Sequence, residues 1–147
     1  MFTNPILAKD EMFELFDNAF RSHELVVDTD CLIRYKGVPL EEGEPQIPDG
    51  YWVFVSKVTA GSQQAGYADT ERRYTTFGNL FVQVFAPMIA ADSSRNGELL
   101  AIAARDIFRG IETEGGVWFR NARYKELESD GKFYRWNVTV EFEFSER

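Results

Sequence analysis

The clearest pattern in the chain is a strict alternation of apolar and polar residues near its C-terminal end. Because successive side chains of a β-strand point to opposite faces of a sheet, this alternation predicts a long strand with one buried face. The pair Asp130-Gly131 before it favours a tight type I′ turn and predicts a partner strand at 117–126. The last third of the chain is therefore predicted to be a long β-hairpin. The apolar set of its final strand is Tyr134, Trp136, Val138, Val140, Phe142 and Phe144.

The segment Leu80–Phe85 lacks this alternation, since it is apolar at nearly every position. It predicts the centre of a strand over 72–87 whose two faces are both covered, with Gly78 marking a bulge and Pro87 ending the strand. Two arrangements would cover both faces. Either helices cover one face and a neighbouring subunit or the return hairpin covers the other, or a monomer covers both faces with its own elements.

A first helix is predicted from apolar residues at helical spacing near the N-terminus. Phe13, Phe16 and Phe20 share one face of this helix. Asn4 is suited to capping the first free amides, and the proline that follows it suits the first helical turn. The helix is therefore predicted over 5–22.

A second helix is predicted between the strand ending at Pro87 and the C-terminal hairpin. Asn96 or Ser94 is the expected N-terminal cap, and Gly110 is the expected C-terminal stop. Its small alanines would let it lie close to a sheet. Its apolar face is Leu100, Ala104, Ile107 and Ile111.

Two further strands are predicted at 31–35 and 51–59, separated by an irregular connection at 36–50 that is rich in Gly and Pro. The chain has 147 residues, which is enough for one domain and short for two. We therefore predict one α+β domain over 1–147. We expect a mainly antiparallel sheet of about five strands, with two helices packed on one face and a long C-terminal β-hairpin.

The chain is acidic, with a net charge of −8 and a pI near 4.7. This balance argues against a direct or sequence-specific grip on nucleic acid, which needs a basic stripe, although it suits a surface past which DNA slides. No segment resembles a signal peptide or a membrane span, so we expect folding in a reducing cytoplasm.

Side chains suited to catalysis are few. His23 is the only histidine and Cys31 the only cysteine, so an ordinary zinc site is not expected, and neither residue has the spacing of a catalytic group. A helix-end or surface role is predicted for His23, and a buried apolar role for Cys31. Glu141 and Glu143 share a strand face and are interpreted as a solvated face. We expect no catalytic residue, no metal and no cofactor, and hence no enzyme.

The stretch Ala60–Glu71 combines small and polar residues between two strong strands and predicts an exposed loop of about twelve residues. Such a loop either has a function or is a surface segment of no consequence. If it functions, its polar and aromatic side chains and the two arginines at its base would contact a tail tube or an adjacent subunit. These candidate interface residues are Gln63, Gln64, Tyr67, Arg72 and Arg73.

The order of the elements and the spacing of the glycines resemble the tail terminator proteins of long-tailed bacteriophages, of the lambda gene product U type. The shared pattern is a strand of the form Gly-x-x-x-Val-x-Val-Phe-x-Pro, a glycine before an Ala-rich helix, and a glycine-containing turn before an alternating last strand. The resemblance extends from about Phe2 to Phe144 and departs from the family in the Pro-rich connection Gly37–Gly50 and in the first strand. The residues that carry it are Gly78, Val82, Val84, Phe85, Pro87, Gly97, Gly131 and 136–144.

The resemblance implies a structural subunit that forms a ring with copies of itself, usually a hexamer. Such a ring caps the head-proximal end of the tail tube in the virion, stops its growth and meets the head connector. Its partners would be itself, the tail tube protein and the head–tail connector protein, with DNA passing through the ring, no membrane, and assembly in the host cytoplasm. The residues also leave open a small monomeric or dimeric α+β domain that binds a ligand or acts as an enzyme, with acidic and tyrosine side chains in a deep pocket.

Overall fold

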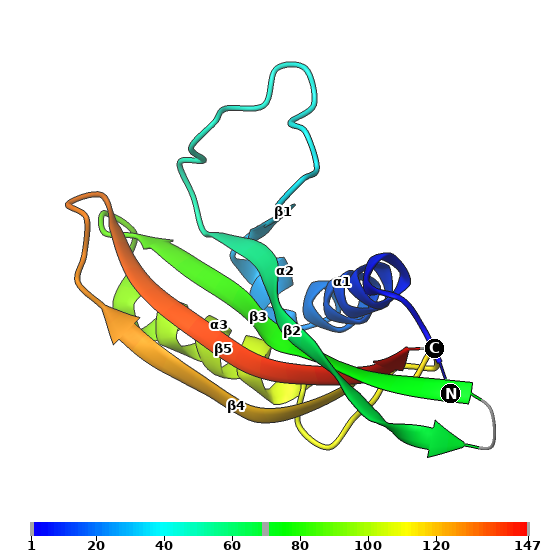
Figure 1. Cartoon of the computed structure of the whole chain (residues 1–147). Coiled ribbons are helices and arrows are strands. Elements are labelled where there is room, and N and C mark those ends of the chain that lie inside the picture. The colour runs from blue at the N-terminus through cyan, green and yellow to red at the C-terminus, as the bar shows by residue number, and fades with distance from the viewer. Residues whose placement is uncertain (1, 69–70, 147) are drawn as a thin grey trace.

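A computed structural model describes residues 2–68 and 71–146, without the side chains of 64–73. Within these residues the chain forms three helices and five strands (Figure 1). The predicted α+β fold is confirmed, with one short helix more than the sequence indicates. The elements are α1 (Pro5–Arg21), α2 (Glu24–Asp28), β1 (Leu32–Tyr35), β2 (Trp52–Ala68), β3 (Glu71–Pro87), α3 (Ser93–Ile107), β4 (Trp118–Leu127) and β5 (Phe133–Glu146).

The described strands form a single sheet in the order β1-β2-β3-β5-β4. The pairs β2–β3, β3–β5 and β4–β5 are antiparallel; β2–β3 and β4–β5 are hairpins, and β5 returns to pair with β3. β1 is the exception, because it pairs parallel with the first residues of β2, from Leu32 opposite Trp52 to Tyr35 opposite Val55. Parallel strands begin at the same end of a sheet, and the long connection between β1 and β2 returns the chain to the end where β1 begins.

One face of the sheet is covered by helices and forms the core. α3 packs against β3, β4 and β5, and α1 packs against α3 (Figure 1). The alternation predicted for β5 is confirmed, because its apolar set points into this layer. The strand residues buried on this face include Val53, Val55, Leu80, Val82, Val84, Trp136, Val138, Val140, Phe142 and Phe144.

α1 begins and ends close to where the sequence predicts. The Asn4 side chain accepts hydrogen bonds from the backbone amides of Ile6 (3.1 Å) and Leu7 (2.9 Å), which satisfies two donors that the helix leaves free. Phe16 and Phe20 stack with their ring centroids 4.8 Å apart inside the core. The aromatic stripe of α1 is therefore structural.

The short helix α2 was not predicted from the sequence. His23 caps it, since its Nδ1 accepts a hydrogen bond from the Leu25 amide at 3.2 Å. The predicted helix-end role of His23 is thus confirmed. Cys31, just after α2, is buried as predicted, and burial raises the pKa of its thiol to about 12.

α3 begins earlier than the sequence suggests. Ser93 is its first residue and Asp92 its cap, so the expected caps Ser94 and Asn96 are wrong. Asp92 has a left-handed backbone conformation, with φ 55°, and makes no side-chain capping bond, so no ordinary capping signal marks this start. Gly97 consequently lies inside the helix rather than before it.

Candidate assembly surfaces

The nearly continuous apolar run Leu80–Phe85 contributes to both faces of the sheet, including the face opposite the helices, called the open face here. Its even-numbered residues Leu80, Val82 and Val84 are buried under the helices, and Phe81 and Phe85 point to the open face, where they are only partly buried. Phe85 stacks on Trp52 across the strands, with ring centroids 4.0 Å apart. Local aromatic contacts therefore shield part of the open face.

Farther along the sheet the open face is exposed. Phe77 and Trp118 both lie next to Glu143 across the strands, and 55% of the Trp118 surface is accessible. Val58, two strands away from Glu143, is about half exposed. The described elements of the chain therefore cover only one face of the sheet completely, in contrast to the predicted alternative of a monomer that covers both faces. Exposed aromatic side chains grouped on one face are typical of surfaces that bind other proteins.

The stretch predicted as a loop at 60–71 is mostly sheet. β2 and β3 continue as one long hairpin through the pair Ala68 and Glu71, so the loop prediction is wrong. Two register shifts interrupt the ladder, between Thr59 and Gly61 and between Gln64 and Gly66. The first lies opposite Gly78, so the predicted bulge is on the partner strand. A side chain at Gly78 would collide with the Val58 carbonyl and the Phe142 ring.

The far end of this hairpin, called the ribbon here, extends beyond the rest of the sheet (Figure 1). β3 pairs with β5 only as far as Tyr74, opposite Glu146. From there to Glu71, about 10 Å at the rise of a strand, β3 has β2 as its only partner among the described residues. A two-stranded ribbon has marginal stability alone, so a partner would stabilise it.

Four of the five predicted interface residues, Gln64, Tyr67, Arg72 and Arg73, lie in this ribbon, and Gln63 lies one residue before it. Gln63 lies opposite Thr75 and has an exposed side chain. The backbones of the other four pair within the ribbon, with Tyr67 opposite Arg72, Gly66 opposite Arg73 and Gln64 opposite Tyr74. The side chains of Gln64, Tyr67, Arg72 and Arg73 lie outside the described residues, so their predicted contacts stay predictions.

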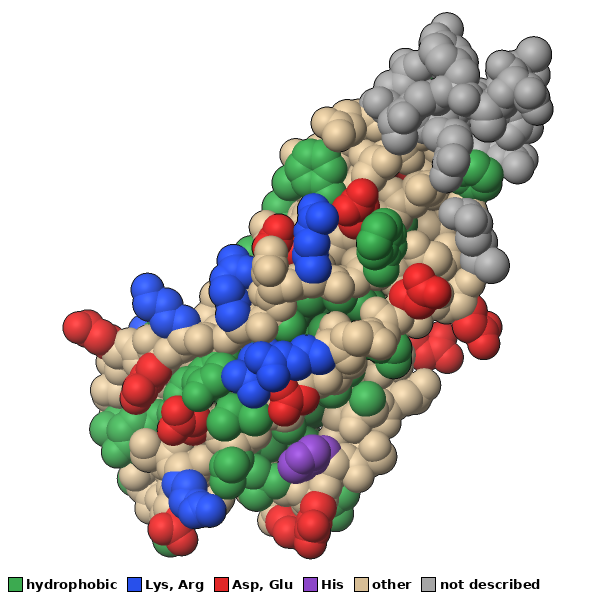
Figure 2. All heavy atoms as spheres, turned by 90° about the horizontal axis from the view of Figure 1, so that it is seen from below, with side chains coloured by type: hydrophobic (Ala, Val, Ile, Leu, Met, Phe, Trp, Pro, Cys, Tyr) green, Lys and Arg blue, Asp and Glu red, His purple; other side chains and the backbone are tan. Residues whose placement is uncertain are grey.

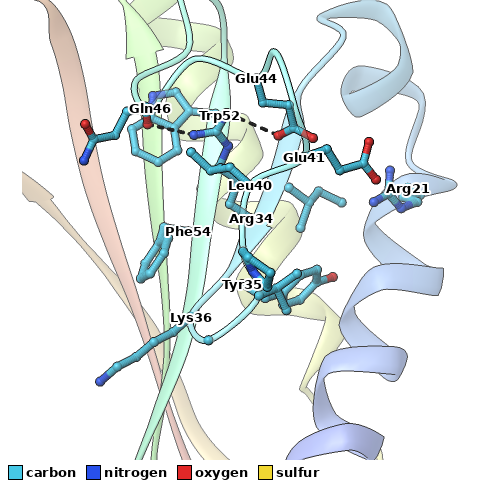
Figure 3. A pocket seen from close by; sticks show the side chains of 14 residues that line it. Arg21, Arg34, Tyr35, Lys36, Leu40, Glu41, Glu44, Gln46, Trp52 and Phe54 are labelled. Carbon is cyan, nitrogen blue, oxygen red and sulfur yellow. Dashed lines mark hydrogen bonds and ion pairs between the residues drawn. The ribbon is translucent and has the colours of Figure 1, made fainter.

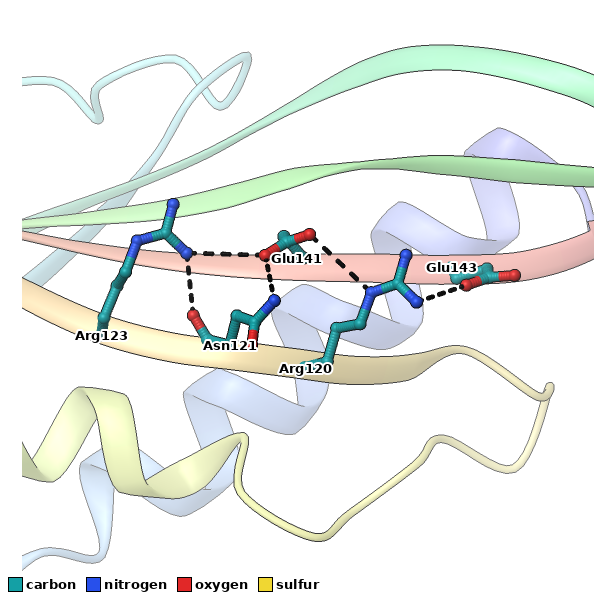
Figure 4. Close-up of polar contacts among 5 residues, drawn as sticks. All are labelled: Arg120, Asn121, Arg123, Glu141 and Glu143. Carbon is teal, nitrogen blue, oxygen red and sulfur yellow. Dashed lines mark hydrogen bonds and ion pairs between the residues drawn. The ribbon is translucent and has the colours of Figure 1, made fainter.

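A network of ion pairs joins β4 to β5 on the open face (Figure 4). Glu141 lies 3.7 Å from Arg120 and 3.6 Å from Arg123, and Glu143 lies 3.4 Å from Arg120. Glu141 also accepts a hydrogen bond of 2.6 Å from Asn121. The interpretation of Glu141 and Glu143 as simply solvated is therefore wrong, because both are partly buried and paired.

Asn121 belongs to a bulge in β4. The register of β4 against β5 shifts between Arg120 and Arg123, and Asn121 has a left-handed backbone with φ 52°. Asn tolerates this conformation better than most residues. The bulge turns Arg120 and Arg123 to the same face, where both reach Glu141. Sequence reasoning missed this cluster, because the extra residue breaks the alternation that marks a strand face.

The connection between β1 and β2 stands out from the body as an irregular loop (Figure 1), and Arg34 holds its base. The Arg34 guanidinium donates hydrogen bonds to the carbonyls of Gln46 (2.7 Å) and Pro45 (2.6 Å) and lies 3.6 Å from Glu44. Figure 3 shows Arg34 between Trp52 and the loop. The loop borders a hollow of about 560 Å³.

This hollow is the place where a ligand-binding domain would be expected to hold its ligand. Convergent polar groups are what fix a small ligand in such a pocket. Arg34 is engaged by loop carbonyls, and the Tyr35 hydroxyl donates to Asp17 at 2.7 Å. In the described residues there is also no group of three or more His, Cys, Asp or Glu side chains placed to hold a metal ion. The geometry therefore favours a structural role for these groups.

Asp17 joins α1 to β1 and gives a testable dependence of stability on pH. Burial alone would raise the pKa of Asp17, but hydrogen bonds from Arg21 (2.9 Å) and Tyr35 together with the Arg21 charge outweigh it, so this pKa lies below its usual range. A carboxyl with a lowered pKa in the folded state stabilises the protein above its unfolded pKa of about 3.9, and this contribution is lost as the pH falls through the folded pKa.

We therefore expect Asp17→Asn to lower the free energy of unfolding by about 1 kcal/mol at pH 7 and by less below pH 4. Urea unfolding at several pH values measures this difference. Asp10→Asn is the matched control, since Asp10 is exposed on the same helix and forms no ion pair among the described residues. A difference between wild type and Asp17→Asn that stays constant from pH 7 to pH 3 would contradict the assignment.

The surface on the side of α2 and α3 has no charged patch of one sign. Figure 2 shows acidic and basic side chains interspersed there, with hydrophobic side chains between them and the single histidine beside them. A shallow hollow between α2 and α3 is lined by Leu25, Leu99 and Ile102. No helix of the described chain is long and apolar enough to cross a membrane.

Comparison with known proteins gives a match in fold and none in sequence. No protein-family model matches the chain, and no curated protein matches it. A solved structure whose name states no function has a TM-score of 0.66 and 14% identity, over 97% of this chain and 96% of the other. A chain in the virion of a native gene transfer agent (GTA) particle has a TM-score of 0.58 and 14% identity, over 94% of this chain and 97% of the other.

This fold also occurs in a virion particle. Both matches cover nearly the whole of each chain, so the likeness concerns the complete arrangement of sheet and helices rather than one motif. At 14% identity the likeness is one of fold. The association with a phage-like virion and the lambda-type family therefore stay predictions from the sequence resemblance.

Proposed function

We propose that this chain is a structural protein of a phage-like tail, a tail terminator that assembles into a ring, most simply a hexamer, on the head-proximal end of the tail tube. The ring stops tube growth and provides the surface that meets the head connector. It assembles in the host cytoplasm and becomes part of the virion. Its partners are further copies of itself, the tail tube protein and the connector protein, with DNA passing through its centre.

The observation that carries this proposal is the fold shared with a chain of the GTA virion over 94% of this chain. Two features of the surface support it. The ribbon extends past its own sheet with only two strands, and the open face carries exposed Phe77 and Trp118. Both are surfaces that a neighbouring protein would cover.

The proposal assigns no chemistry to the chain. Cys31 is buried and its pKa raised, which makes the thiol unreactive, and His23 is engaged as a helix cap. The protein would act by shape, burial of apolar surface and strand pairing, and hold no metal or cofactor.

Shortening the ribbon tests the proposal. Residues 65–73 are replaced by Asn-Gly, which joins the paired residues Gln64 and Tyr74 through a two-residue hairpin turn. Because β3 contacts β5 only from Tyr74 onward, the circular dichroism spectrum and the melting temperature should change little. We expect loss of ring formation in solution or on tail tubes, and tubes of uncontrolled length in an assembly reaction.

A length-preserving variant separates the side chains of the ribbon from its backbone. Tyr67→Ser combined with Arg72→Ser and Arg73→Ser keeps the ribbon and removes three predicted contact side chains. If these side chains make the contact, this variant should fail as the shortened one does. A shortened protein that still forms rings and still yields tails of normal length would show that the ribbon is not the assembly contact.

A further inference from the structure

The loop between β1 and β2 has an unusual charge. Residues 38–50, called the acidic arm here, contain four acidic residues and no basic one. Glu44 pairs with Arg34 at the base of the arm, and Asp49 pairs with Lys132 at 3.4 Å. Glu41 and Glu42, in the middle of the arm, are exposed and form no ion pair among the described residues. Two carboxylates are thus presented to solvent on a projecting loop.

The acidic arm also exposes apolar side chains. More than half of the surface of Val38 and of Ile47 is accessible, and Leu40 is exposed beside Glu41. The hydrogen bonds from Arg34 to the carbonyls of Pro45 and Gln46 fix one side of the arm to the sheet. Apolar and acidic groups held together on a fixed, projecting loop are suited to contact a surface that is itself apolar and basic.

β4 presents such a surface. It contains three basic residues, Arg120, Arg123 and Lys125, against one acidic residue, in a chain whose net charge is −8. The Arg120 and Arg123 side chains remain 61% and 59% exposed although both contact Glu141, and a guanidinium has five N–H donors, so each retains donors for a second partner. Trp118 at the start of β4 adds an exposed aromatic ring.

The acidic arm and β4 lie at opposite edges of the sheet. The arm joins β1 to β2 at one edge, and β4 forms the other (Figure 1). Asp49 at the end of the arm reaches Lys132 in the β4–β5 turn, but Glu41 and Glu42 form no ion pair with β4 of the same chain among the described residues. Two different surfaces that complement each other on identical subunits produce head-to-tail contacts, which close into a ring when the rotation between subunits allows it.

We propose that the acidic arm of each copy binds β4 of the next copy, with Glu41 and Glu42 facing Arg123 and Lys125. This inference rests on the proposed ring and names the two surfaces through which neighbouring subunits of the ring would touch. The basic side chains of β4 could also bind the phosphates of a nucleic acid. The acidic arm favours a second copy as the partner, because only that partner uses both surfaces.

Charge exchange between two variants tests this pairing. The arm variant carries Glu41→Lys and Glu42→Lys, and the strand variant carries Arg123→Glu and Lys125→Glu. In each variant alone the two surfaces carry the same sign, so we expect self-association to weaken by about tenfold or more, equivalent to about 1.4 kcal/mol. An equal mixture restores opposite signs at both kinds of interface, and assembly should return to near the wild-type level. Sedimentation velocity at low and moderate salt measures both effects.

Matched controls carry the same charge changes elsewhere. Glu24→Lys with Asp28→Lys on α2, and Arg95→Glu on α3 with Arg109→Glu two residues after the end of α3, should assemble as the wild type does. If the melting temperature of the strand variant is much lower than that of the wild type, Lys125→Glu alone replaces it, because Lys125 forms no ion pair in the described chain. Its mixture with the arm variant should still assemble better than either alone.

The outcomes separate the interface from the ring. If the wild type self-associates and both charge-reversed variants self-associate equally well, this interface is overturned and the ring remains. The same holds if the variants fail singly and their mixture also fails. A wild-type chain that stays monomeric both in solution and on tail tubes would overturn the ring and the interface together. Retarded migration of DNA with the wild type, lost in the strand variant while assembly is unchanged, would assign β4 to nucleic acid instead.

Discussion

Val140→Asp is expected to unfold the protein or bring it close to unfolding. Val140 lies in the middle of β5 with no exposed surface, under the helices. An aspartate there would bury a carboxylate without a partner, at a cost of about 4 kcal/mol or more, while domains of this size are stable by only about 5–15 kcal/mol. Thermal melting followed by circular dichroism measures the loss.

Thr139→Asp is the matched control for this prediction. Thr139 precedes Val140 on β5 and points to the open face, where Arg123 lies opposite it. The same carboxylate is therefore placed beside a positive charge at a partly exposed site, and the change in stability should stay within about 1 kcal/mol. Equal effects of the two substitutions on the melting temperature would mean that the assigned faces of β5 are wrong.

Gly97→Val should be the second strongly destabilising substitution. A Cβ at Gly97 would stand 2.9 Å from the Cβ of Ala86 and still closer to the Trp136 ring, so α3 could not keep its distance from the sheet. Overpacking of a well-packed core commonly costs about 1–3 kcal/mol, and the two further methyl groups of valine place the cost at or above the upper end. This should outweigh the slightly better helix propensity of valine.

Gly50→Val provides the comparison for Gly97. Gly50 precedes β2, is exposed, and has no atom within 4 Å of an added Cβ. Its substitution should change the free energy of unfolding by no more than about 0.5 kcal/mol. Urea unfolding of the two variants beside wild type measures the difference. If Gly97→Val is as stable as Gly50→Val, α3 does not press against β5 at this point.

The elements predicted correctly are those whose signals are local and regular. β5 has an uninterrupted alternation, and α1 has both a capping Asn4 and an apolar stripe. The features that were missed have weak or conflicting local signals. α2 is only five residues long, and the start of the predicted helix α3 follows Asp92, whose left-handed backbone does not match the ordinary capping pattern.

The ribbon was predicted as a loop for a different physical reason. Residues 60–68 are small and polar, which disfavours a strand by propensity, but a continuous ladder with β3 overrides this preference. The two register shifts, at Ala60 and Ala65, also interrupt the period of two that marks a strand. Pairing with β3 determines the structure of this segment, and the local sequence of the segment does not contain that information.

The candidate surfaces were predictable only in part. The five interface residues could be placed on one exposed segment, because that segment separates two strong strands. The open face could not be predicted, because it depends on which side of the sheet α1 and α3 occupy. The cluster around Glu141 depends on the bulge at Asn121, which brings Arg120 and Arg123 to one face from positions three residues apart.

The bulge in β4 also bears on the solubility of the free chain. A long, regular edge strand offers unpaired amides and carbonyls to any other edge and can nucleate fibrous aggregates. In β4 the ladder is broken between Arg120 and Arg123, and the charged side chains there oppose the approach of an identical strand. This irregularity therefore protects the chain from unlimited edge-to-edge polymerisation at high concentration.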